Sequence, residues 1–139
     1  MREFKFRAWD KALKFMGRVV ELSFADNGKG VQPVVARVQN LRDFGQVEHY
    51  VTSDEIKNQL YIEQYTGLKD KNGVEIYEGD IVEYKSEMVN FHNIAKVVYF
   101  ADEATFAFTV SKNAYYTPSD VYEVIGNIHE NPELLEVEE

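Results

Sequence analysis

The chain has 139 residues, of which 45% are apolar and 28% are charged, and this is the composition of a soluble globular domain. The absence of cysteine excludes a disulfide scaffold, a cysteine-ligated metal and a thiol nucleophile, and it suits a cytoplasmic location. The net charge of −9 argues against general nucleic-acid binding, because that affinity comes largely from neutralised phosphates. Residues 1–11 lack a signal-peptide core and no run of about 20 apolar residues is present, so neither export nor a membrane span is expected.

Charge is distributed unevenly along the sequence. Residues 1–20 contain six basic and two acidic residues, whereas residues 113–139 contain seven acidic residues and no Lys or Arg. The acidic end is therefore either a solvated tail or a segment that lies against the basic N-terminal residues, of the same subunit or of a neighbour.

The first third of the chain has the pattern of strands. Residues 4–9 alternate phenylalanine or alanine with basic residues or tryptophan, which is typical of a half-buried strand. Turn-compatible residues follow at 10–14, and a second alternating segment at 19–24 completes a predicted β-hairpin. Two weaker strand patterns lie at 33–38 and 47–51.

A short helix is predicted near 53–60, because Thr52 and Glu55 have capping-box spacing. The segment 60–65 could extend this helix or begin a strand, and we favour the strand. After it, the Asn72-Gly73 pair favours the positive φ angles of a tight hairpin turn. Further strands are predicted at 81–84, 94–100, 104–110 and 122–128.

This pattern predicts a mainly β chain, an all-β or β-dominated α+β fold, with one short helix. We expect two small β subdomains within one compact chain. The first covers residues 1–59, and the second covers residues 60–139, with a partly open barrel followed by the acidic tail.

Motifs that carry chemistry are missing from the sequence. The three histidines, at 49, 92 and 129, form no H-E-x-x-H pair, and no serine lies in a G-x-S-x-G elbow. We therefore expect no catalytic residue, no metal site and no cofactor. If the protein were an enzyme, Glu78 and Asp80 would be the first candidates as acid/base groups, with His92 or His129 approaching from another strand. Asp80 also has a structural alternative as an acceptor for backbone N–H groups in a turn.

Two aromatic clusters are candidates for an interaction surface. Lys5, Arg7 and Trp9 share one face of the predicted N-terminal strand and could stack a base or grip a peptide. The alternative, which we favour, is that Trp9 closes the core or an oligomer interface. Tyr115 and Tyr116 lie in a predicted loop, where exposed tyrosines would suit a protein contact.

Assembly is suggested by the two ends of the chain. The strand at 4–9 is a candidate sheet edge, and unpaired edges recruit other chains. The acidic tail contains Leu134, Leu135 and Val137, which have little reason to be apolar in a solvated segment. We therefore predict a homo-oligomer in which these three side chains pack on a neighbouring subunit.

Three stretches, at 5–11, 64–82 and 124–134, together resemble the YopX family of phage and prophage proteins. The stretch from Gln64 to Val82 is the most specific, whereas residues 17–60 match poorly. The resemblance implies a β-rich fold whose second half resembles an SH3-like barrel, with self-association. It also implies a phage or prophage origin in a firmicute-type host.

The resemblance supplies a structural signature and no active site. Its residues have backbone roles: positive φ or close approach for the glycines, turn formation for Asn72 and Asp80, and chain termination for the proline. The signature residues are Gly67, Asn72, Gly73, Gly79, Asp80, Gly126 and Pro132.

These observations together predict a phage-encoded accessory protein of the bacterial cytoplasm. It would act as a non-enzymatic module that binds a host or phage protein. The alternative is a regulatory protein that binds nucleic acid, or that mimics it through an acidic surface.

Overall fold

The computed structural model describes residues 3–26, 28, 30–40, 47–52, 56, 58–88, 91–111 and 114–135. At residues 40, 47–52, 91 and 111 it describes the backbone alone. No helix among the described residues is long and apolar enough to cross a membrane.

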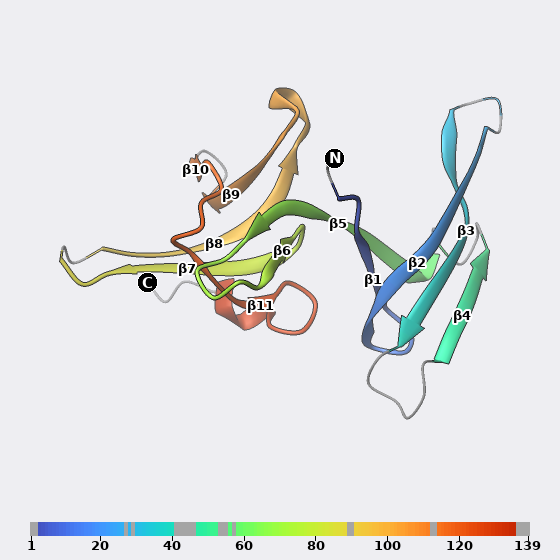
Figure 1. Cartoon of the computed structure of the whole chain (residues 1–139), viewed down its shortest axis with the longest axis horizontal. Helices are drawn as coiled ribbons and strands as arrows, with labels where there is room; N and C mark the ends of the chain where they lie inside the picture. The colour runs from blue at the N-terminus through green and yellow to red at the C-terminus, as the bar shows by residue number, and fades with distance from the viewer. Residues whose placement is uncertain are drawn as a thin grey trace. The chain divides into compact units, whose positions relative to one another are not determined.

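The described chain consists almost entirely of antiparallel strands (Figure 1), which confirms the predicted mainly β fold. The first five strands are β1 (Phe6–Asp10), β2 (Phe15–Asp26), β3 (Val31–Asn40), β4 (Val47–Thr52) and β5 (Leu60–Lys69). The others are β6 (Glu75–Tyr77), β7 (Asp80–Ser86), β8 (Phe91–Phe100), β9 (Thr105–Ser111), β10 (Ala114–Tyr116) and β11 (Glu123–Asn127). Two 3-10 helices complete the chain, η1 (Ala101–Glu103) and η2 (Pro132–Leu135).

The chain divides into two compact units, each with its own hydrophobic core. The N-terminal unit is Phe4–Gln64, and the C-terminal unit holds the described residues of Tyr65–Glu139 with those of Met1–Glu3. The N-terminal core is built from Ala8, Phe15, Ala36, Val38, Ile56 and Leu60. The C-terminal core is built from Ile76, Val82, Ala95, Val97, Phe108 and Tyr122. The domain boundary that the sequence places after residue 59 stays a prediction.

The predicted N-terminal hairpin is confirmed. β1 and β2 pair in register from Phe6 with Val19 to Asp10 with Phe15. The turn between them is held by Asp10, whose Oδ1 accepts hydrogen bonds from the backbone N–H groups of Ala12 and Leu13, at 2.9 and 2.8 Å.

The prediction that the N-terminal strand is a sheet edge is wrong. β1 lies between β2 and β5 in the strand order β4-β3-β2-β1-β5-β6, so both of its sides are hydrogen-bonded. Its basic face is accommodated because Arg7 lies directly opposite Glu63 of β5 and donates a 3.0 Å hydrogen bond to its carboxylate. The neighbour that neutralises the charge is far away in sequence, which is why the alternation of residues 4–9 alone gave no sign of it.

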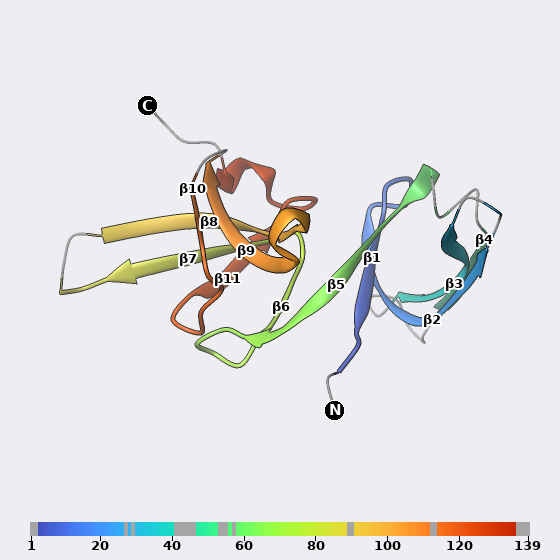
Figure 2. The same cartoon turned by 90° about the horizontal axis from the view of Figure 1, so that it is seen from above.

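The C-terminal unit contains a second antiparallel sheet, in the order β10-β9-β8-β7-β11. Strands β7 to β10 follow one another as a meander, and β11 returns to pair with β7 (Figure 2). Among the described strands no pairing joins β10 to β11, so the sheet is open. The SH3-like barrel therefore stays a prediction here.

Two local predictions for the middle of the chain can be assessed. Ile56, Asn58 and Gln59 are α-helical, in agreement with the predicted short helix, while its capping residues lie outside the described residues or have only their backbone described. The strand reading of 60–65 is confirmed, because this segment begins β5.

Candidate functional site

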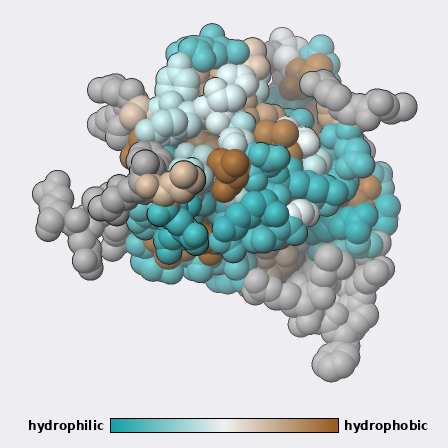
Figure 3. Space-filling view, turned by 60° about the vertical axis from the view of Figure 1, so that its left-hand side comes forward, coloured by the Kyte–Doolittle hydropathy of each residue, from teal (hydrophilic) through white to brown (hydrophobic). Residues whose placement is uncertain are grey.

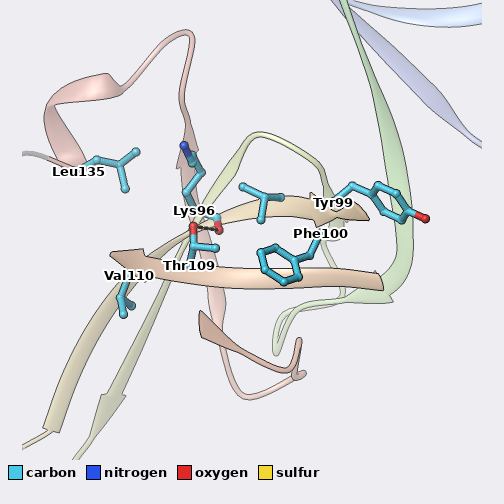
Figure 4. Close-up of a pocket in the computed structure, with 7 residues that line it drawn as sticks. Lys96, Tyr99, Phe100, Thr109, Val110 and Leu135 are labelled. Atoms are coloured by element: carbon cyan, nitrogen blue, oxygen red, sulfur yellow. Dashed lines mark hydrogen bonds between the residues drawn. The ribbon is translucent and has the colours of Figure 1, made fainter. Parts of the chain in front are cut away.

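An open groove of about 510 Å³ lies on the sheet of the C-terminal unit. It is lined by Lys96, Val98, Tyr99, Phe100, Thr109, Val110 and Leu135, from β8, β9 and η2 (Figure 4). Strand alternation explains the floor of the groove. Ala95 and Val97 of β8 are fully buried in the core, so the intervening Lys96, Val98 and Phe100 point to the opposite face.

Aromatic rings cluster at the Phe100 end of this groove. The ring of Tyr115 lies 5.0 Å from that of Phe100, and Tyr99 packs edge-on against Phe106 at 5.3 Å. The Tyr115 hydroxyl donates a 2.7 Å hydrogen bond to Glu103, and this bond raises the pKa of the tyrosine above its ordinary value of 10.0. Glu103 is therefore held at the hydroxyl of Tyr115, whose ring packs against Phe100.

Tyr115 and Tyr116 are both exposed, but the prediction that they lie in a loop is wrong. They belong to β10, a short strand at the edge of the sheet that pairs with β9. A bulge between Ala114 and Tyr115 allows this pairing, and such irregularities are not visible in the sequence.

Lys5, Arg7 and Trp9, the basic-aromatic candidate patch, do not form an exposed surface. Trp9 is 7% exposed and belongs to the buried set of β1, in agreement with the alternative that it closes the core. Lys5 and Arg7 are half-buried, and Arg7 pairs with Glu63. An exposed ring beside free cations, as base stacking requires, is not present at these three residues.

The acidic candidates for chemistry have structural partners. Asp80 is 2% exposed, and its Oδ2 accepts a 2.8 Å hydrogen bond from the backbone N–H of Tyr77, as the turn alternative predicts. Glu78, two residues earlier, is half-buried. His92 is bonded to Glu83 at 2.8 Å, and this bond is the main reason that the pKa of Glu83 lies below its ordinary value. Among the described residues, no three His, Asp or Glu side chains are grouped as metal ligands.

The turn between β5 and β6 is organised by a buried carboxylate. Asp70 Oδ1 accepts hydrogen bonds from the backbone N–H groups of Asn72 and Val74, at 2.8 and 2.9 Å. Its Oδ2 accepts a third, at 2.9 Å, from Val124 of β11. Positive φ in this turn is confined to Gly73, so the expectation of positive φ at both Asn72 and Gly73 is wrong. The side chain of Asn72 instead donates to Glu123, at 3.2 Å.

The remaining signature residues have the expected kind of backbone role, with one exception. Gly67 and Gly79 have φ of 89° and 82°, while Gly126 makes a close approach, since a Cβ there would lie 2.5 Å from Asn131 Oδ1. The exception is Pro132, which was expected to end the chain's structure but instead begins η2, where its missing N–H costs nothing.

Comparison with protein families decides where this fold belongs. The model of the YopX protein family matches residues 5–136, which is almost the whole chain. The chain belongs to the YopX family. A search of the curated proteins finds no match.

Two solved structures share the fold of this YopX-family chain. A crystal structure of protein EF1440 from Enterococcus faecalis matches with a TM-score of 0.66 and 30% identity, over 98% of this chain and 100% of that one. A crystal structure of protein yopX from Bacillus subtilis matches with a TM-score of 0.59 and 24% identity, over the full length of both chains. These matches show the fold, and the names of the two proteins state no activity.

The tail residues of this YopX-family chain lie partly on its own sheet. Leu134 and Leu135 are half-buried in η2, and Leu135 lines the groove over β8 and β9. Val137 lies outside the described residues. At least one of the leucines predicted to contact a neighbouring subunit is thus already in contact with its own chain.

Of the residues that line the groove, the sequence analysis singled out only Leu135, and it named none of those from β8. The missed signal lies in the side chains of β8 that face away from the core. Of the three that line the groove, Val98 and Phe100 are apolar, whereas a face exposed to water usually carries polar side chains. Without the register, either set of β8 could have been the core set.

Proposed function

We propose that this YopX-family protein is a non-enzymatic module that binds another protein. The observation that carries the proposal is the groove over β8 and β9. Its aromatic end presents Tyr99, 50% exposed, and Tyr115, 44% exposed, beside apolar side chains of the sheet. Aromatic residues over an apolar floor are enriched at protein interfaces, because they bury a large area at low entropy cost.

The proposal is tested by site-specific photo-crosslinking of the full chain in cells. A photoreactive amino acid replaces Tyr99 in the groove, and a matched variant carries it at Leu13, which is also exposed but lies in the N-terminal unit. We expect one discrete crosslinked protein from the Tyr99 variant and none of that species from the Leu13 variant. If no protein crosslinks from any exposed position, and a small molecule is turned over in a manner that depends on Glu78 or Asp80, the proposal is wrong.

A second candidate, mimicry of nucleic acid, is favoured by the distribution of charge between the units. Phe4–Gln64 contains nine Lys or Arg and eight Asp or Glu, a net charge of +1, whereas the rest of the chain contains six and sixteen, a net charge of −10. A mimic would compete with DNA for a basic protein, and reversing the acidic charges within 130–139 would abolish the competition. Direct nucleic-acid binding is disfavoured by the same charge.

We retain the homo-oligomer as part of the proposal. A chain that ends at Asn131 lacks η2 and the predicted contact residues Leu134, Leu135 and Val137. We expect light scattering to show a smaller assembly for this chain than for the full-length protein. A full-length monomer, or an assembly unchanged by the truncation, would show the tail assignment to be wrong. The phage or prophage origin and the cytoplasmic location stay expectations.

A further inference from the structure

We infer that the groove over β8 and β9 binds an extended segment of a partner protein that has apolar residues in its middle and cationic residues at both ends. This inference rests on the proposed protein-binding function and adds to it the site and the chemistry of the partner. It combines three features of the groove: its floor, its two ends, and a single lysine.

The floor of the groove is largely apolar. Val98 and Phe100 line it from β8, and Leu135 lines it from η2, with Phe100 and Leu135 at opposite ends (Figure 4). A volume of about 510 Å³ that is open to solvent suits side chains of a peptide laid along the hairpin better than an enclosed small molecule, which is usually buried over most of its surface.

Acidic residues lie close in the chain to lining residues at both ends of the groove, although they do not line it themselves. Asp102 and Glu103 are exposed and follow Phe100 by two and three residues, and Glu103 accepts a hydrogen bond from the hydroxyl of Tyr115, whose ring packs against Phe100. At the other end, the exposed Glu133 lies two residues before Leu135 in η2. The C-terminal unit has a net charge of −10, so its field attracts cations toward both ends. Figure 3 shows that the visible surface is mostly hydrophilic, with scattered hydrophobic patches.

Lys96 determines which kind of partner residue suits the middle of the groove. Among the described residues it is the only Lys or Arg that lines the groove, and no ion pair joins it to a described carboxylate. A cation of the partner placed over Lys96 would be repelled, whereas a backbone carbonyl would be attracted. The groove therefore favours a neutral middle between two cationic ends, and it disfavours nucleic acid, whose phosphates would meet Asp102, Glu103 and Glu133.

A second copy of this chain is a poorer occupant. Its C-terminal unit carries the same excess of negative charge, so two such faces repel each other, and its N-terminal unit is close to neutral. A partner with a basic and apolar segment is complementary to the groove in charge and in hydrophobicity.

The experiment measures fluorescence anisotropy with a labelled peptide of about eight residues, which spans roughly 26 Å when extended. The probe has arginine at both ends and leucine, valine and tyrosine between them, and a matched peptide has glutamate at both ends. The full-length chain is compared with the double variant Asp102→Lys/Glu133→Lys. The control is Glu87→Lys/Asp120→Lys, which makes the same change in net charge at two exposed residues that belong to neither η1 nor η2.

We expect the arginine peptide to bind the full chain and the glutamate peptide to bind at least about tenfold more weakly. Asp102→Lys/Glu133→Lys should weaken binding of the arginine peptide about tenfold or more, and the control double variant less than about threefold, a difference in binding free energy of about 0.7 kcal/mol or more. Tyr99→Ser should also weaken binding, with far-UV circular dichroism showing that each variant is folded.

Equal weakening by the two double variants would overturn the inference, because binding would then follow net charge alone. Equal affinity for the two peptides would overturn it as well. If the crosslinked partner still binds Asp102→Lys/Glu133→Lys as it binds the unchanged chain, the groove inference fails while the proposed function stands. If no partner is crosslinked from any exposed position and a small molecule is turned over in a manner that depends on Glu78 or Asp80, the proposed function itself fails. A change in oligomeric state that is confined to Asp102→Lys/Glu133→Lys would assign the groove to a second copy and overturn the partner chemistry.

Discussion

Replacing Asp70 by asparagine should lower the free energy of unfolding of the C-terminal unit by about 2 kcal/mol. The carboxylate, 5% exposed, accepts three backbone hydrogen bonds, two at Oδ1 and one at Oδ2. Asparagine can keep the two bonds at Oδ1, but its NH2 group then faces the N–H of Val124. A buried donor is left without an acceptor, and a bond that joins the β5–β6 turn to β11 is lost.

Asp26→Asn is the matched control for this substitution. Asp26 also accepts a backbone hydrogen bond in a turn, from Gly28 at 2.8 Å, but it is exposed and this bond joins residues only two positions apart. We expect its effect on stability to stay within about 0.5 kcal/mol. The measurement is urea denaturation followed by far-UV circular dichroism, and an effect of Asp70→Asn as small as that of Asp26→Asn would contradict the assigned role.

The effect of Asp70→Asn should depend on pH in a direction that its environment fixes. Burial acts to raise the pKa of Asp70, but the hydrogen bonds from Val124, Val74 and Asn72, together with nearby Lys71, hold it below the ordinary value of 3.8. A carboxyl whose pKa is lower in the folded state stabilises the protein above its unfolded pKa, and this contribution is lost as the pH falls through the folded value. The stability difference between the unchanged chain and Asp70→Asn should therefore be constant near pH 7 and shrink below about pH 4. A difference that grows on acidification would show that the carboxylate form is not the stabilising one.

Asp70 also shows how far sequence reasoning reaches in this chain. The Asn72-Gly73 pair is a local signal, so the turn between β5 and β6 was predicted correctly. The bond from Val124 to Asp70 joins residues 54 positions apart, and no local pattern reveals it. The strands were found for the same reason as the turn, because alternation and β-branched residues act over a few neighbours.

Errors arose wherever a residue's role depends on a distant partner. The basic face of β1 indicated an exposed edge until Glu63 of β5 was placed opposite Arg7. Tyr115 and Tyr116 were predicted to lie in a loop, but their pairing with β9 places them in the strand β10. The groove depends on which set of β8 faces the core, and this is fixed by packing against residues such as Phe108 and Tyr122. In this chain the local residue pattern is enough to predict most of the strands. Which side chains reach the surface depends on how the strands pair, and the local pattern does not show this.

Gly17 provides the most direct test of packing in the N-terminal unit. Gly17 is buried in β2, and a Cβ added to it would overlap Cγ1 of Val38, while also lying 3.0 Å from the ring of Phe15 and 3.1 Å from the backbone oxygen of Gln39. Val38 is 2% exposed and belongs to the core of this unit. We expect Gly17→Ala to lower the free energy of unfolding of this unit by about 2 to 3 kcal/mol, as overpacked cores do.

The overlap with Val38 can be separated from other effects by a double-mutant cycle. Val38→Ala removes Cγ1 and leaves a cavity, at a cost of about 2 kcal/mol when made alone. Because the new methyl at Gly17 partly fills that cavity, the double variant Gly17→Ala/Val38→Ala should be more stable than the sum of the two single effects predicts, by about 1 kcal/mol or more. The unfolding transition can be followed by the fluorescence of Trp9, the single tryptophan, which lies on β1 directly opposite Met16. Strictly additive effects would show that the methyl at Gly17 meets the backbone of β3 and not the side chain of Val38, since only the side-chain overlap is relieved by Val38→Ala.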